Sequence, residues 1–276
     1  MVIGAGTMGA GIAQVFALSE ATSCVYLTDV TAELAENGKR LIGKSLGRSV
    51  AKERLTQQQA DAAIAKIVPG LKEIGADADW VLEAAIEDMN IKKKLFAELD
   101  AMVREDSVFA TNTSSLSITA LSAGLQHPLI GMHFFNPAPV MKLVEVVSGE
   151  LTPQTVLEQA TQLVCSLGKE PVQVKDAPGF VVNRLLIPMI NEAVFLLSEG
   201  TASAKDIDTA MKLGANHPMG PLALCDLIGL DVVLAIMQTL QAETGDDKYR
   251  PAPLLRKMVR AGKLGRKSRE GFFSYQ

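Results

Sequence analysis

The first half of the chain alternates short apolar runs with longer segments in which apolar residues recur at helical spacing. The runs predict buried strands, and the amphipathic segments between them predict helices. The expected strands are 24–28, 80–84, 108–111, 129–132, 143–147 and 172–174, and the expected helices are 9–19, 32–55, 57–67 and 153–167. This alternation is typical of an α/β domain with a mostly parallel sheet and helices on both faces.

After Asp-Ala-Pro-Gly at 176–179 the pattern changes to helices alone, expected at 180–198, 204–213, 222–227, 232–244 and 254–261. Asp231 follows a break at Gly229, so we expect it to cap the helix that comes next. We therefore expect two domains, an α/β domain at 1–175 and an all-α domain at 176–276.

Composition narrows the class of protein. The 276 residues are 48% hydrophobic, enough for one large or two ordinary domain cores. The net charge of −4 argues against nucleic acid or an anionic membrane as partner, so a polyanionic ligand would need a local basic cluster.

Cys24, Cys165 and Cys225 are odd in number and far apart, which favours a reducing, cytoplasmic setting over disulfides or zinc. The longest apolar tract, 180–197, is interrupted by polar residues and is expected to be a buried helix rather than a membrane span.

A glycine-rich motif, Gly4-Ala5-Gly6-Thr7-Met8-Gly9, follows the apolar residues 1–3, and Asp29 follows it in turn. Gly4 permits a tight turn, Gly6 lets the backbone approach a pyrophosphate, and Gly9 lets the helix pack closely on the sheet. Asp29 would accept hydrogen bonds from ribose hydroxyls, so the motif predicts a Rossmann-like dinucleotide site. Only three residues precede Gly4, fewer than the usual five or so, and we expect the first strand to pair weakly.

A histidine and a glutamate occupy two neighbouring predicted strands. His133 ends one strand, where α/β sheets bind ligands, and Glu145 lies between valines in the next. A buried carboxylate needs a partner, and pairing with His133 would fix the imidazole tautomer so that the other ring nitrogen acts as a base. The alternative is a structural histidine with an exposed glutamate. His127 and His217 both precede prolines and are expected in a surface turn and a loop.

Polar residues also follow the strand at 108–111. Asn112 and Ser114 are expected to face the cleft, while Ser115 or Ser117 caps the following helix.

The helix at 32–55 carries a stripe of cations spaced by four residues, Arg40, Lys44, Arg48 and Lys52. Like charges at this spacing repel, so a phosphate-rich ligand could neutralise them; a merely solvated face remains the alternative. The opposite face is expected to pack inward through Leu34, Leu41, Ile42, Leu46 and Val50.

Together these residues resemble the 3-hydroxyacyl-CoA dehydrogenase family, including its short-chain bacterial 3-hydroxybutyryl-CoA members. The resemblance runs nearly end to end and is carried by GAGTMG (4–9), EAAIED (83–88), NTSSL (112–116), GMHFFNPAPVMKLVEV (131–146), DAPGFVVNR (176–184) and HPMGPLALCDLIGLD (217–231). It implies an NAD-binding Rossmann-like domain, a helical domain that forms a homodimer interface, and reversible NAD-dependent oxidation of (S)-3-hydroxyacyl-CoA.

The resemblance also implies roles for residues. His133 matches the catalytic base, Glu145 its orienting carboxylate, and Ser114 and Asn183 the residues that contact substrate. NAD-contacting positions fall on Asp29, Glu87, Lys92, Asn112 and Lys267. Lys52 falls where the family contacts coenzyme A, and the charge stripe adds Arg48. A repulsive Asp29 favours NAD over NADP.

One departure from the family concerns Arg269, which stands where a glycine is usual, and leaves the conformation of the loop carrying Lys267 open. Two other functions are the alternatives. A β-hydroxyacid dehydrogenase acting on free acids would need a lysine four residues before Asn183, where this chain has Gly179. A non-catalytic, crystallin-like relative would not need the candidate catalytic residues that are all present.

Overall fold

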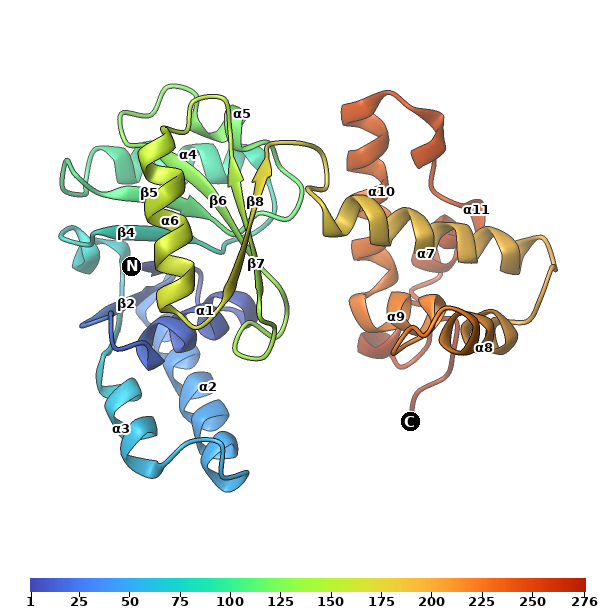
Figure 1. The fold of residues 1–276 in the computed structure, drawn as a ribbon, viewed down its shortest axis with the longest axis horizontal. Coiled ribbons are helices and arrows are strands. Elements are labelled where there is room, and N and C mark those ends of the chain that lie inside the picture. Colours follow the sequence, from blue (N-terminus) through green and yellow to red (C-terminus); the bar gives the residue numbers. More distant parts are fainter. The chain divides into compact units, whose positions relative to one another are not determined.

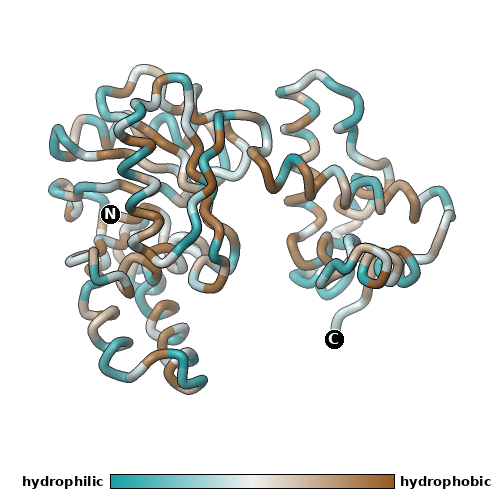
Figure 2. The backbone as a smooth tube through the Cα atoms, viewed as in Figure 1, coloured by the Kyte–Doolittle hydropathy of each residue, from teal (hydrophilic) through white to brown (hydrophobic).

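The computed structural model describes residues 1–276 and divides into two compact units, Met1–Ala177 and Pro178–Gln276 (Figure 1). The division lies two residues beyond the boundary expected from the sequence. Hydrophobic and hydrophilic positions alternate along helices of both units, as expected for elements that bury one face (Figure 2).

The first unit is built on one eight-stranded sheet of order β3-β2-β1-β4-β5-β6-β7-β8. Strands β1 to β6 are mutually parallel, β7 is antiparallel to β6, and β8 is parallel to β7. The strands are β1 (Val2–Ile3), β2 (Val25–Thr28), β3 (Ile67–Gly70), β4 (Trp80–Glu83), β5 (Val108–Thr111), β6 (Leu129–Phe134), β7 (Leu143–Ser148) and β8 (Glu170–Lys175).

Helices cover both faces of this sheet, as the alternating pattern predicts. The helices are α1 (Thr7–Leu18), α2 (Ala32–Ala51), α3 (Gln57–Ala65), α4 (Met89–Asp100), α5 (Ile118–Ser122) and α6 (Gln154–Ser166). Alternate strand residues such as Leu82, Ala110 and Met132 join the core formed with α1, α2, α3 and α6. The intervening residues face α4 and α5, where Ile118 lies against Gly131. Two sets of side chains therefore point to opposite faces, as the period of a strand requires.

Three expectations for this unit need correction. The helix expected to 67 ends at Ala65, and the following residues form the edge strand β3, in which Pro69 is tolerated because edge strands need not donate every hydrogen bond. The helix expected at 32–55 ends at Ala51, and Lys52 is its C-cap. The two-residue β1 pairs with both β2 and β4, and the weakness of this pairing stays a prediction. On α2, Ile42 and Leu46 are buried as expected, but Leu34 and Leu41 are exposed because they turn toward the cationic side.

The second unit contains helices only: α7 (Val182–Ser198), α8 (Ala204–Gly214), α9 (Pro221–Ile228), α10 (Leu230–Thr244) and α11 (Pro253–Arg260), with short 3₁₀ turns at Asp247–Tyr249 and Arg266–Ser268. Asp231 does not cap α10, because the helix already begins at Leu230 and Gly229 is its N-cap. No single helix is long and apolar enough to cross a membrane; α9 and α10 reach that length and composition only as a pair bent by 97°, and they supply core residues here.

Candidate active site

The glycine-rich turn links β1 to α1 and fits a bound dinucleotide. Gly4 has φ +92°, and a Cβ on it would lie 2.6 Å from the Ala84 carbonyl oxygen. A Cβ on Gly9 would lie 1.6 Å from the Gly4 carbonyl oxygen, so only glycine permits this helix–strand contact. A Cβ on Gly6 meets no protein atom within 4 Å, and Gly6 caps α1 without a side-chain hydrogen bond. The first turn of α1, at Thr7 and Met8, therefore offers backbone N–H groups to an anion in open space.

Asp29 lies directly after β2, one strand away from that turn. Its Oδ2 accepts from the Ala5 N–H at 2.7 Å and its Oδ1 accepts from the Val30 N–H at 2.7 Å. Each carboxylate oxygen has further acceptor capacity, so the side chain is oriented by the backbone and can still receive hydroxyl donors.

His133 and Glu145 are brought together by the sheet. They are opposite residues in the antiparallel β6–β7 pair, and His133 Nδ1 lies 2.7 Å from Glu145 Oε2. Both side chains are buried, and the imidazole lies 4.4 Å from the Phe135 ring, measured between centroids. A carboxylate at Nδ1 favours the tautomer with its proton on Nδ1, which leaves the lone pair on Nε2. The pairing expected from the sequence is present, and the alternative of an exposed glutamate is wrong.

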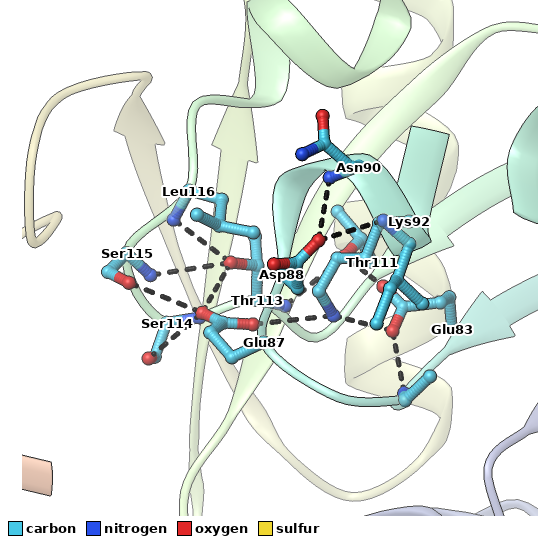
Figure 3. A network of polar contacts seen from close by, with 12 residues as sticks. Glu83, Glu87, Asp88, Asn90, Lys92, Thr111, Thr113, Ser114, Ser115 and Leu116 are labelled. Carbon is cyan, nitrogen blue, oxygen red and sulfur yellow. Dashed lines mark hydrogen bonds and ion pairs between the residues drawn. The ribbon is translucent and has the colours of Figure 1, made fainter. Parts of the chain in front are cut away.

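Glu87 organises the segment that follows β5. Its Oε1 accepts from Thr113 Oγ1 at 2.7 Å and from the Ser114 N–H at 2.8 Å, and the Ser114 and Ser115 hydroxyls lie 3.3 Å away (Figure 3). Burial by itself would raise the pKa of Glu87, but the nearby Lys92 ammonium and these hydrogen bonds outweigh it and lower the pKa. Glu87 is therefore held ionised beside Ser114.

Asn112 ties the ends of two strands together. Its N–H donates to the Glu83 carbonyl, and its Oδ1 accepts from the Phe134 N–H at 2.8 Å. Ser117 caps α5, as one of the two expected alternatives, by accepting from the Ala120 N–H.

Glu83 is the residue that the sequence reasoning left without a role. It ends the apolar strand β4, is fully buried, and forms an ion pair with the fully buried Lys92. The signal that could have found it is the one used for Glu145, a carboxylate in an otherwise apolar strand.

Two candidates belong to the second unit. Asn183 is buried in the first turn of α7. Lys267 lies in the 3₁₀ turn Arg266–Ser268, and its ammonium lies 2.5 Å from the Asp231 carboxylate. Arg269 is the C-cap of this turn and has φ +62°. Arg269 therefore adopts the left-handed conformation that the glycine usual at this position would enter without strain.

The cationic stripe on α2 lies on the surface. Arg40, Lys44, Arg48 and Lys52 are all exposed and none forms an ion pair with a carboxylate. The stripe is thus available to an anionic ligand.

His127 is not a surface residue, contrary to expectation. It is buried, with Nδ1 2.6 Å from Asp100 Oδ1, Nε2 2.9 Å from the Arg104 carbonyl oxygen, and its ring stacked on Phe109. Its position before Pro128 predicted only the local turn. His217 has intermediate exposure in the loop between α8 and α9, as expected.

The glycine turn, Asp29 and His133 all lie at the carboxyl ends of parallel strands, and therefore at one edge of the sheet. A dinucleotide site sharing that edge with a histidine oriented by a buried acid defines an NAD-dependent oxidoreductase.

Comparisons with known proteins agree with this class. The model of the 3-hydroxyacyl-CoA dehydrogenase NAD binding domain matches residues 1–177, and that of the 3-hydroxyacyl-CoA dehydrogenase C-terminal domain matches residues 179–275. The chain therefore belongs to the 3-hydroxyacyl-CoA dehydrogenase family.

Individual relatives match over almost their whole length. A 3-hydroxybutyryl-CoA dehydrogenase of Clostridioides difficile is 51% identical, over 99% of this chain and 98% of its own. The crystal structure of (S)-3-hydroxybutyryl-CoA dehydrogenase PaaH1 from Ralstonia eutropha superposes with a TM-score of 0.94 at 47% identity, and that of FadB2 from M. tuberculosis with 0.96 at 38%. Both alignments cover 100% of this chain and 98% of the solved one.

Proposed function

We propose that this protein catalyses the reversible oxidation of a short (S)-3-hydroxyacyl-CoA, such as 3-hydroxybutyryl-CoA, to the 3-ketoacyl-CoA. The observation that carries the proposal is the 2.7 Å contact between His133 and Glu145 at the ligand-binding edge of the sheet. The names of the C. difficile and R. eutropha relatives support the choice of substrate.

His133 is the base in this proposal. Its Nε2 accepts the proton of the substrate 3-hydroxyl group, and the adjacent Glu145 carboxylate stabilises the imidazolium that forms. NAD, when bound, supplies the acceptor for the hydride that leaves C3. Ser114 and Asn183 orient the reacting oxygen, which raises the fraction of bound substrate in reactive geometry.

The other candidates bind the two ligands. Asp29, Glu87, Asn112 and Lys267 contact NAD, and the buried Lys92 serves the same site through its ion pair with Glu87. The Asp29 carboxylate repels the 2′-phosphate of NADP. Arg48 and Lys52, exposed and without an acidic partner on α2, bind phosphate groups of coenzyme A.

We further propose that the protein is cytoplasmic and forms a homodimer or a higher homo-oligomer through its second unit, without nucleic acid or a membrane as partner. Large exposed apolar side chains on that unit, Leu185, Leu213 and Leu227, support an interface there.

The proposal is tested by following NADH absorbance with acetoacetyl-CoA, with the free acid acetoacetate, and with neither. Rapid NADH loss with the CoA thioester alone is the expected result. Loss with the free acid only would mean a β-hydroxyacid dehydrogenase, and no loss with either would mean a non-catalytic protein.

A further inference from the structure

Two linked ion pairs, Glu83–Lys92 and Lys92–Glu87, form an ion-pair network that runs from the interior of the first unit to Ser114. Glu83, at the end of β4, lies 2.5 Å from the Lys92 ammonium, measured from Oε1 to Nζ. Lys92 is on α4, and its Nζ lies 3.3 Å from Glu87 Oε2. The side chains of Glu83 and Lys92 are 0% and 1% exposed, whereas that of Glu87 is 37% exposed. These ion pairs thus begin at a buried carboxylate and end at a partly exposed one. Figure 3 draws the three side chains.

Both carboxylate oxygens of Glu83 accept hydrogen bonds. Oε1 also accepts from the Ala85 N–H at 2.6 Å, and Oε2 accepts from Thr111 Oγ1 at 2.6 Å. A carboxylate with two such donors and a buried cation is fixed in position, and it fixes the cation in turn. The shorter of the two Lys92 contacts is the one to Glu83, so the ammonium is drawn toward the core.

The position of Lys92 matters for Glu87. While Glu83 holds the ammonium, Glu87 Oε1 receives the donors of the segment 113–115 and Oε2 faces Lys92. Without the Glu83 charge, Glu87 would be the nearest anion to a buried ammonium, and burial makes an unpaired charge costly. Lys92 would then shift toward Glu87 and compete with Thr113 and Ser114 for its carboxylate.

The ion-pair network lies on the same face of the sheet as the His133–Glu145 pair. Glu83 pairs in register with Thr111, and Thr111 with Gly131, two residues before His133. Register partners in a parallel sheet and residues two apart in one strand share a face.

We propose that Glu83 is a positioning residue of the active site: by anchoring Lys92 in the core, it leaves Glu87 to orient the Ser114 segment and to contact the cofactor. The inference rests on the proposed function insofar as that function gives Glu87 and Ser114 their roles. A residue that served only the stability of the fold would have no energetic connection to Glu87, which it does not touch.

A double-mutant cycle on NADH affinity tests this. Glu83→Gln and Glu87→Gln, alone and combined, are compared with the wild type by NADH fluorescence titration without acyl substrate. Each single variant is expected to weaken NADH binding by about fivefold, and the double variant by about the same factor, because both substitutions disrupt the same ion-pair network. Glu98→Gln, which removes a glutamate from the exposed ion pair with Lys72, is the matched control and leaves the affinity unchanged.

Losses that multiply in the double variant would overturn the proposal, as would either single variant with wild-type NADH affinity. Should Glu83→Gln not fold, Glu83→Asp keeps the charge, withdraws it by one methylene group and enters the same cycle. Turnover of acetoacetyl-CoA by the wild type separates the two hypotheses: if it is normal, a failed cycle removes only the role of Glu83, and if it is absent the proposed function fails on its own.

Discussion

His133 and Glu145 are cross-strand neighbours in the one antiparallel pair of an otherwise parallel set of strand pairings, with Nδ1 and Oε2 2.7 Å apart. Opposite residues of an antiparallel pair project to the same face, so the reversal of chain direction after β6 creates the contact. A further parallel strand in the place of β7 would require a long crossover and would not return residue 145 to His133.

Replacing either member of this pair is expected to remove turnover without removing cofactor binding. His133→Gln loses the base and should lower kcat by roughly 10²–10⁴-fold, and Glu145→Gln, which keeps the size of the side chain but not its charge, by roughly 10²-fold or more. Both are measured with acetoacetyl-CoA and NADH, with NADH fluorescence titration as the control. Undiminished turnover of His133→Gln would take the base role from this residue.

Two glycines of the turn are expected to respond oppositely to alanine. A Cβ at Gly6 enters open space where a pyrophosphate would lie, so Gly6→Ala should fold normally and lose NADH affinity by tenfold or more, about 1.4 kcal/mol. A Cβ at Gly9 would overlap the Gly4 carbonyl, so Gly9→Ala should be destabilised. Urea unfolding and NADH titration of both variants distinguish the two effects. Normal binding by Gly6→Ala would place the pyrophosphate elsewhere.

Asp29 is expected to set the preference between the two nicotinamide cofactors. Its carboxylate lies at the end of β2, oriented by the Ala5 and Val30 N–H groups. Asp29→Asn removes the repulsion of a 2′-phosphate, so the ratio of kcat/KM for NADH to that for NADPH should fall by about tenfold. Steady-state kinetics with each cofactor gives the ratio. An unchanged ratio would mean that another group excludes NADPH.

Asp100 is expected to make stability depend on acid pH. Burial alone would raise its pKa, but the backbone N–H groups of Gln126 and His127 and the His127 ring outweigh it and hold the pKa below the ordinary 3.8. A lowered carboxyl pKa stabilises the fold above that ordinary value, and the contribution is lost as the pH falls through the folded-state pKa. Asp100→Asn should therefore lower the free energy of unfolding at pH 7, and the difference from wild type should shrink below pH 3.8.

Urea unfolding at several pH values measures this difference. Asp61→Asn, on the exposed side of α3, serves as the control and should match the wild type throughout. A difference between Asp100→Asn and wild type that does not vary with pH would show that the charge is unimportant.

Arg269 is expected to be a site of strain. Its φ of +62° is disfavoured for any residue with a Cβ. Arg269→Gly should raise the free energy of unfolding by about 1 kcal/mol, because the relief of strain exceeds the added chain entropy of glycine, whereas Arg269→Ala keeps the Cβ and should change it little. Equal effects of the two substitutions would mean that the arginine side chain, and not the backbone, is responsible.

Much of the fold could be predicted because its signals are local. Apolar runs and helical periodicity identified most strands and helices of both units, and the spacing of the glycines identified the turn before α1. The contact between His133 and Glu145 was also predictable, since a carboxylate among valines demands a partner. The strand β3 was not, because Ile-Val-Pro-Gly has no strand pattern of its own and becomes a strand only by pairing with β2.

Other residues depended on contacts distant in sequence. The burial of His127 requires Asp100 and Phe109, which belong to different elements. The ion pair of Glu83 and Lys92 forms because α4 packs on the face of the sheet to which Glu83 points. Leu34 and Leu41 are exposed because the opposite face of α2 packs on the rest of the first unit.

The sequence by itself determined the elements, their class and the residues able to do redox chemistry, because periodicity, turn geometry and side-chain chemistry are properties of short segments. Only the tertiary structure decided the direction of β7, the depth of each charged side chain and its partner. Those depend on strand pairing and burial, in which residues far apart in the chain share one low-dielectric interior.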